Sequence, residues 1–308
     1  MDTDTEDFKQ TKVYTQLKRN GLVSIDGTFK TLDKALDALE SYDKLHEEKS
    51  KFWDGIFGLG FLVILIAFGW GVIESQTLIE SLIDHRPMII MGIIGSGIAA
   101  FSGLMARRAQ AEDIEDERYQ TARTILKMVS RDIAFNQVLH LHLGLWKSTH
   151  GRNVTKVKPA IKKFAWRSTK HEDPWFRLSG RFLDGTKFWV AINEKIEIRE
   201  RKKISQSGKR KTKYKSRADT EITVRLKIKQ EHYPNFKSLN GDYALPTRTR
   251  LKKARTKGPR ISLTCVREIP KRPGSHSGKL LKNNRLECLT VLLLGAYQPL
   301  NASRRVTT

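Results

Sequence analysis

Residues Gly55 to Ile73 read GIFGLGFLVILIAFGWGVI, 19 consecutive residues without a charged side chain. As an α-helix this stretch is about 28 Å long, which matches the hydrocarbon thickness of a bilayer. A second uncharged stretch, PMIIMGIIGSGIAAFSGLMA, runs from Pro87 to Ala106. The alternative, a pair of buried core helices, is disfavoured because such helices seldom stay uncharged over this length. The two stretches predict a two-span transmembrane helical hairpin, with helices at 54–74 and 87–106 joined by a short extracytoplasmic loop at 75–86.

The flanking charges predict the orientation of this hairpin. Lysines precede the first stretch and Arg107 and Arg108 follow the second, whereas the link between them carries Glu74, Glu80 and Asp84. Cytoplasmic flanks are enriched in Lys and Arg. We therefore expect a multi-pass protein of the cell (inner or plasma) membrane, integral to the lipid bilayer, with both termini cytoplasmic.

Small residues recur along the second stretch at helical spacing. Small side chains let two helix backbones approach closely. The pattern fits packing against the first span and equally fits a homo-oligomer formed through the second. The candidate helix-packing residues are Gly92, Gly95, Ser96, Ala99, Ala100 and Gly103.

Helical patterns also flank the two spans. After an N-terminal cytoplasmic segment, 1–30, apolar residues recur every three or four positions over 31–53, which predicts an amphipathic helix. A similar stripe within 107–149 predicts a cytoplasmic stalk helix. If continuous, a stalk of about 40 residues would place the next domain roughly 60 Å from the bilayer.

The charge of the chain is divided unequally. The 308 residues carry a formal charge of +24, but residues 1–149 have 17 basic and 21 acidic side chains, whereas residues 150–308 have 40 and 12. The second half is therefore the part that would attract a polyanion. Two cysteines, without CxxC spacing, support neither a disulfide scaffold nor a zinc module.

Strand patterns dominate this basic half. Alternating apolar residues over Trp175–Leu183 and Thr186–Ile198 surround Asp184-Gly185, a strong hairpin signal. Further strands are expected at Ile222–Ile228, Ile261–Ile269 and Leu286–Tyr297, the last central and buried. We expect an α+β membrane protein with a basic linker at 150–171, a small antiparallel all-β domain of about five strands at 172–300, and a tail at 301–308.

Two very basic stretches hold most of the excess charge. RERKKISQSGKRKTKYKSR runs from Arg199 to Arg217 and RTRLKKARTK from Arg248 to Lys257, and both are interpreted as connections between strands. Such stretches suit nucleic acid, anionic lipid or an acidic protein, or are merely solvated. The candidate polyanion-binding residues are Arg199, Arg201, Lys202, Lys203, Lys209, Arg210, Lys211, Lys213, Lys215, Arg217, Arg248, Arg250, Lys252, Lys253, Arg255 and Lys257.

Signals for catalysis are weak. The chain has no phosphate-binding glycine loop, no GxSxG and no HExxH, and we expect no catalytic residues, no cofactor and no metal. In VLHLHLGLW, His140 and His142 would share one face of a strand, but further metal ligands are not evident nearby. Cys265 and Cys288 fall at expected strand positions and are interpreted as buried thiols. Glu172-Asp173 is interpreted as part of a loop.

Together these patterns favour a non-enzymatic, membrane-anchored interaction module that presents a basic β domain to a polyanionic partner. The alternative is an oligomeric pore-forming or effector membrane protein with a cytoplasmic sensing domain. A membrane enzyme is the third hypothesis.

Overall fold

The computed structural model describes residues 12–76, 86–111, 114–147, 151–159, 165–204, 208–234, 236, 245–269 and 278–302. Within the chain, two compact units are distinguished, one of residues 39–114 and one of residues 1–38 and 115–308. Most of the extracytoplasmic loop expected at 75–86 and of the tail expected at 301–308 lies outside the described residues.

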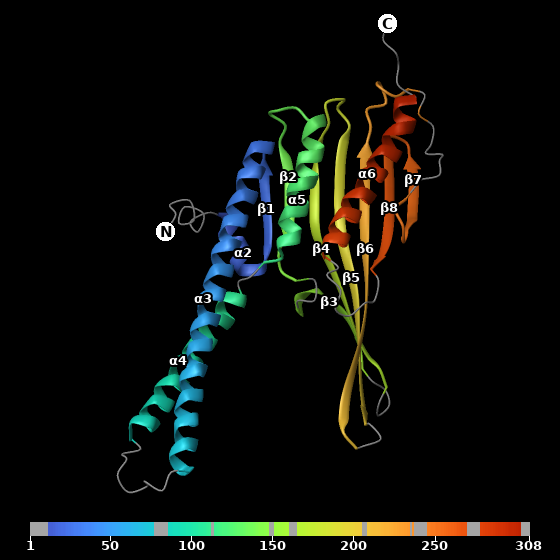
Figure 1. The fold of residues 1–308 in the computed structure, drawn as a ribbon. Helices are drawn as coiled ribbons and strands as arrows, with labels where there is room; N and C mark the ends of the chain where they lie inside the picture. Colours follow the sequence, from blue (N-terminus) through green and yellow to red (C-terminus); the bar gives the residue numbers. More distant parts are fainter. Residues whose placement is uncertain are drawn as a thin grey trace. The chain divides into compact units, whose positions relative to one another are not determined.

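The smaller unit contains two long helices, most of α3 (Phe29–Gln76) and all of α4 (Arg86–Ala111) (Figure 1). Both are long and apolar enough to cross a membrane. The amphipathic helix expected at 31–53 and the first span are one continuous helix, α3, because no proline or cap interrupts the sequence between them.

Glycines bring α3 and α4 close together. A Cβ atom added to Gly95 would lie 3.0 Å from the Ile64 side chain and 3.1 Å from the Gly60 carbonyl oxygen. Ala99 is buried, and Gly103 faces Phe57. The other three candidate helix-packing residues, Gly92, Ser96 and Ala100, are not buried. Three of the six candidates therefore pack within the hairpin, and the other three do not.

The larger unit is built on an eight-stranded antiparallel sheet in the order β1-β2-β4-β5-β6-β8-β7. The strand β4 is long: β2 pairs with its second half, and β3 pairs with its first half. A short helix, α2 (Lys12–Asn20), precedes the sheet. The strands are β1 (Leu22–Gly27), β2 (Leu139–Gly144), β3 (Val154–Lys158), β4 (Arg167–Arg181), β5 (Lys187–Ile204), β6 (Arg210–Lys227), β7 (Thr249–Lys257) and β8 (Arg260–Ile269).

The hairpin predicted around Asp184-Gly185 is confirmed as β4 and β5. Gly185 in its turn has a φ of +81°, and the Asp184 carboxylate accepts a hydrogen bond from the Thr186 amide at 2.8 Å. Pro174 has no amide hydrogen for the sheet, and it lies in a β-bulge between Asp173 and Phe176. The bulge turns Trp175 into the core, where its side chain is fully buried.

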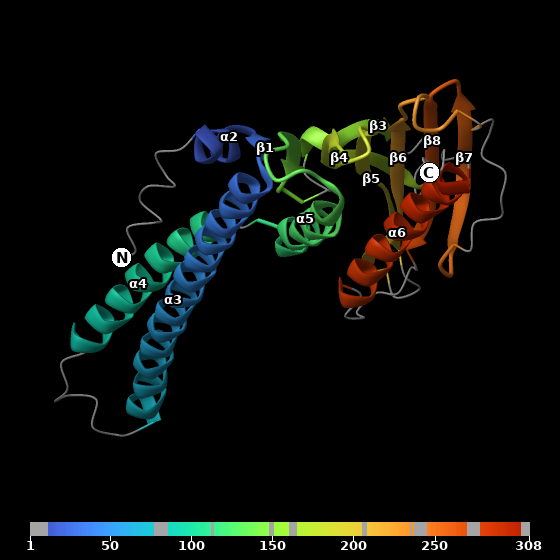
Figure 2. The same ribbon diagram turned by 90° about the horizontal axis from the view of Figure 1, so that it is seen from above.

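In the part of the chain that the structure describes, helices cover one face of this sheet. Figures 1 and 2 show α5 (Asp116–Val129) and α6 (Gly278–Ala302) on the same side, and α5 contacts β2 and β4 while α6 contacts β6 and β8. The sheet residues beneath them are buried and apolar: Leu141, Leu178, Phe188, Val190, Ile192, Val224, Leu226, Leu263 and Cys265. We call the other side the open face.

Several expectations about this unit were wrong. The sheet has eight strands instead of five, and the domain is not all-β. Leu286–Tyr297 is not a central strand but part of α6, whose buried residues Cys288, Leu289, Leu292, Ala296 and Leu300 recur at helical spacing. A short apolar run is compatible with a strand or a helix, and here the three- and four-residue spacing of the buried residues corresponds to a helix.

The stalk expected at 107–149 is also wrong as a single helix. After α4 ends, α5 covers only Asp116–Val129, a 3₁₀ turn η1 follows at Ser130–Asp132, and Leu139–Gly144 is strand β2. The expected separation of roughly 60 Å therefore has no basis. Since β1 and β2 belong to the sheet, the domain also does not begin at residue 172.

Candidate polyanion-binding surface

The first basic stretch is not a connection but a two-stranded ribbon formed by the far ends of β5 and β6 (Figure 1). Beyond Glu200, β5 pairs only with β6, because the β4 pairing ends at Arg167. Neither face of such a ribbon is buried, so its sequence lacks the alternating apolar residues that predict a strand and is simply basic. The side chains of β6 from Arg210 to Arg217 are all exposed.

Cations lie opposite cations on one face of this ribbon. Arg199 pairs with Lys215, Arg201 with Lys213, and Lys203 with Lys211. Directly opposed residues of antiparallel strands point to the same side, where like charges repel. We call these six residues the cationic ribbon. Lys202 and Arg210 lie on its other face.

Within the cationic ribbon, four residues have no carboxylate partner among the described residues: Arg201, Lys203, Lys211 and Lys213. Towards the sheet, Arg199 donates a hydrogen bond to Glu197 at 2.9 Å, and Lys215 lies 5.3 Å from the centre of the Trp166 ring. Hydrogen bonds from Arg199 and Ser168 lower the pKa of Glu197 to about 2. Arg217 pairs with Glu268 at 3.0 Å. Among the six residues of the cationic ribbon, those with compensating contacts are therefore the ones at its base.

The second basic stretch is likewise a strand, the edge strand β7, apart from Arg248, which precedes it with a φ of 64°. Charged edge strands resist unwanted pairing with other chains, which is one reason for lysine and arginine here. A bulge between Leu251 and Lys253 keeps Arg250, Lys253 and Arg255 on the open face. Lys252 pairs with Glu221 at 2.9 Å.

The two predicted basic stretches do not form one patch. Their near ends are separated by Glu268, which pairs with Arg217, and their far ends lie at opposite ends of the sheet. Lys211 and Lys227, the β6 residue level with Lys257, are 16 residues apart, about 50 Å at 3.3 Å per residue. Paired carboxylates occupy the open face between the ends of the strands. Lys195, for example, bridges Glu221 at 3.0 Å and Glu172 at 3.3 Å. Glu172-Asp173 is accordingly part of β4 and not of a loop.

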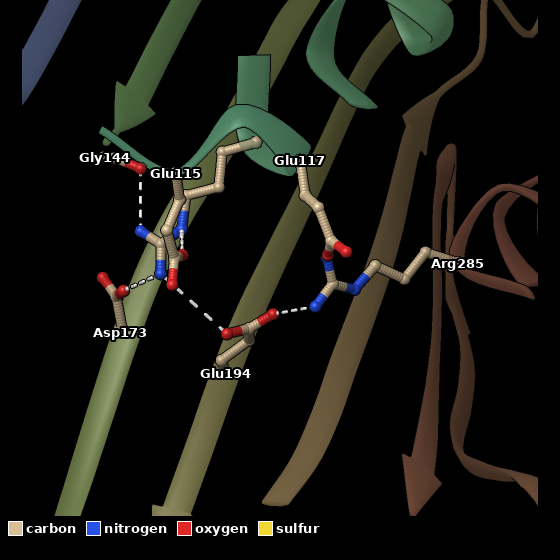
Figure 3. A network of polar contacts seen from close by, with 7 residues as sticks. Glu115, Glu117, Gly144, Asp173, Glu194 and Arg285 are labelled. Atoms are coloured by element: carbon tan, nitrogen blue, oxygen red, sulfur yellow. Dashed lines mark hydrogen bonds and ion pairs between the residues drawn. The ribbon is translucent and has the colours of Figure 1, made fainter. Parts of the chain in front are cut away.

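A buried ionic network joins the helices to the sheet (Figure 3). Arg118 of α5 donates hydrogen bonds to Asp173 of β4 at 2.7 Å and to the Gly144 carbonyl at 2.8 Å. Glu115 also binds Arg118, and burial raises the pKa of Glu115. Arg285 of α6 binds Glu194 of β5 and lies 3.7 Å from Glu117. Each arginine in this network has carboxylate partners.

Sequence reasoning missed this network because its members come from four separate segments. Arg118 and Asp173 are almost fully buried. The guanidinium carbons of Arg118 and Arg285 lie 5.3 Å and 5.7 Å from the centre of the Trp175 ring. Its location between two layers, with each arginine paired to carboxylates, is typical of a structural clamp. The one sequence signal for this network is Arg118, a charged residue on the apolar side of the predicted helix.

The remaining candidates occupy structural positions. His140 and His142 share the open face as expected, and His140 lies 2.8 Å from Asp26. Cys265 lies on β8 and Cys288 on α6, not on a strand, and both are buried free thiols. A hydrogen bond from Cys265 lowers the pKa of Cys288 to about 7 and raises that of Cys265.

The described residues contain no group of three or more potential metal ligands. We compared the whole chain with known proteins at three levels. No protein-family model, no curated protein and no solved structure matches it.

Proposed function

We propose that the protein is a membrane-anchored, non-enzymatic module that binds a phosphate-rich polyanion through the cationic ribbon. The single observation that carries this proposal is the set of three opposed cation pairs on one face of an unaccompanied β-ribbon. Each opposed pair costs the fold about 0.2–1 kcal/mol. A polyanion would remove this repulsion and release its own counterions on binding.

The anchor in this proposal is the pair α3 and α4. Their apolar side chains point outward, with Phe68 71% and Ile93 67% exposed. Contiguous apolar surface of this kind is unfavourable in water and favourable in lipid. The flanking lysines and arginines favour a cytoplasmic location for both termini. An active cytosolic reporter fused after Thr308, together with resistance to alkaline extraction, tests the anchor and its orientation.

The binding experiment uses the full chain in nanodiscs of neutral phosphatidylcholine. The isolated fragment 150–308 is unsuitable because it lacks strands β1 and β2. Lys211, Lys213 and Lys215 are replaced together by Gln, and labelled nucleic acid is titrated at several salt concentrations. A control triple variant removes equal charge from exposed Lys127, Arg131 and Lys147.

We expect the ribbon variant to weaken binding for all sequences and the control variant to leave it unchanged. Each lost phosphate contact should reduce the salt slope by about 0.7 to 0.9. Equal affinity in the two triple variants would contradict a role for the ribbon. Anionic vesicles and an acidic peptide are titrated in parallel, and binding to one of these alone would reassign the partner.

One observation favours the alternative, an oligomeric pore or effector. Gly92, Ser96 and Ala100 form a line of small residues on α4 that the hairpin does not bury. Small residues at such positions promote close helix association in membranes. A purified monomer or dimer that leaves liposomes sealed supports the anchor, whereas a larger ring with dye leakage supports the pore.

A further inference from the structure

A row of five cations crosses the open face at the end of the sheet farthest from the ribbon. The register pairs Arg181 with Lys187, Lys187 with Lys227, Lys227 with Arg260, and Arg260 with Lys257. The row therefore crosses five neighbouring strands, β4, β5, β6, β8 and β7. Adjacent strands are about 4.8 Å apart, so the cations form a line roughly 19 Å long.

A tryptophan lies beside this row on the same face. Trp189 is two residues from Lys187 on β5 and is half-buried, while its neighbours Phe188 and Val190 point into the core. The guanidinium carbon of Arg225 lies 4.3 Å from the centre of the Trp189 ring, and that of Arg177 lies 5.6 Å away. Three planar π systems are thus grouped on an exposed part of the sheet.

The surface is also hollowed next to the ring. A cavity of about 260 Å³ is lined by nine residues of β5, β6 and β8: Lys187, Phe188, Trp189, Arg225, Leu226, Lys227, Arg260, Ile261 and Ser262. Its lining includes the Trp189 ring and four cationic residues beside three apolar residues. We call the five-cation row together with Arg177, Trp189 and Arg225 the Trp189 surface.

Among the described residues of these strands, no acidic side chain interrupts this surface. The three rows of open-face residues that contain Lys187, Trp189 and Ala191 have no carboxylate on β4, β5, β6, β8 or β7. They also include Lys253 and Arg255 of the edge strand. The surface is therefore positive throughout, unlike the middle of the open face, where the carboxylates of Glu172 and Glu221 pair with lysines.

We propose that the Trp189 surface binds single-stranded nucleic acid, with phosphates along the cation row and a base against Trp189 and its flanking guanidinium groups. This inference deepens the proposed function and rests on it. Exposed aromatic and arginine side chains on a sheet stack with unpaired bases, and lines of cations follow the backbone. In a duplex the bases are already stacked, so the ring and the cavity would have no partner.

A set of four ligands tests this proposal on the full chain in neutral nanodiscs. The ligands are a labelled single-stranded oligonucleotide, an abasic oligomer with the same number of phosphates, a duplex of the same sequence, and vesicles containing phosphatidylserine. We expect the strand with bases to bind at least fivefold more tightly than the abasic oligomer. Base–aromatic stacking contributes roughly a five- to 150-fold factor per base.

Substitutions at Trp189 separate stacking from charge. Trp189→Leu should lose most of the preference for bases, with the abasic affinity unchanged, while Trp189→Phe should retain much of that preference. Replacing Lys187, Lys227 and Arg260 by Gln should weaken both oligomers to a similar extent. Amide hydrogen exchange of β5 and β6 verifies that each variant is folded.

The outcomes distinguish this inference from the proposed function. Equal affinity for abasic and base-containing strands overturns the stacking role but leaves polyanion binding by the ribbon intact. Tighter binding of the duplex, or an unchanged base preference in folded Trp189→Leu, also overturns it. Binding to the phosphatidylserine vesicles alone reassigns the surface to a membrane, and no binding to any ligand at low salt overturns both proposals.

Discussion

The helix-covered face of the sheet and the two ends of its open face differ in how their cations are compensated. On the helix-covered face, Arg118 and Arg285 are buried and each has carboxylate partners between the layers. On the open face, Arg201 lies opposite Lys213, and Lys227 lies between Lys187 and Arg260. Charges that stabilise the fold are compensated internally. Charges that repel one another within the fold are the basis on which we propose a polyanionic partner.

The largest expected effect is on the covered face. Arg118→Met should leave Asp173 buried without its cation and destabilise the unit by about 3–5 kcal/mol. Hydrogen exchange of the β4 and β5 amides measures this loss. Glu117→Gln, at the exposed end of the network, should cost less than 1 kcal/mol. If Arg118→Met together with Asp173→Leu does not recover stability, the clamp interpretation is wrong.

Removing cations from the cationic ribbon should increase its stability instead of lowering it. Replacing Lys211, Lys213 and Lys215 by Gln removes three opposed pairs and should stabilise the ribbon by about 1–2 kcal/mol in total. Amide exchange in β5 beyond Glu200 should slow, and added salt should have less effect than in the native chain. Faster exchange in the variant would show that the lysines stabilise the ribbon.

Substitution of the two thiols between α6 and β8 should change stability less. Cys265 and Cys288 are buried, so replacing both by Ala should cost about 1 kcal/mol through lost packing. In the native chain, alkylation should be slow despite the lowered pKa of Cys288, because access to the sulfur atoms is blocked. Rapid labelling under native conditions would contradict the close packing of α6 on β8.

The smallest effect is a pH dependence at the base of the ribbon. The pKa of Glu197 is lowered to about 2, so its contribution to stability is present above its ordinary pKa of 4.5 and is lost as pH falls towards 2. Glu197→Gln should therefore be slightly less stable than the native chain at pH 6 and equal to it near pH 2. A difference that grows on acidification would contradict this assignment.

Sequence patterns predicted the parts of the fold that have a repeating apolar face. The hairpin of β4 and β5 and the strands β6 and β8 followed from alternation, and the two apolar helices from uncharged length. The ribbon strands were mistaken for connections because a free ribbon buries neither face. Leu286–Tyr297 was expected as a strand because a short apolar run does not distinguish strand from helix.

Only part of the candidate site followed from the sequence. Lys211 and Lys213 stood out by charge, but their opposition to Lys203 and Arg201 depends on register, which charge does not specify. Trp189 was overlooked although the alternation of Phe188, Val190 and Ile192 places it on the polar side of the strand. A large aromatic residue at such a position is the sequence signal for this surface.

The salt dependence of polyanion binding tests the central claim most directly. Full chain in neutral nanodiscs is titrated with labelled nucleic acid between 50 and 200 mM salt. If about six phosphates contact the uncompensated cations, affinity should fall by roughly three decades over this range, and the Lys211, Lys213 and Lys215 variant should have a flatter slope. Binding that does not change with salt, or that is lost equally in the Lys127, Arg131 and Lys147 control variant, would contradict the account.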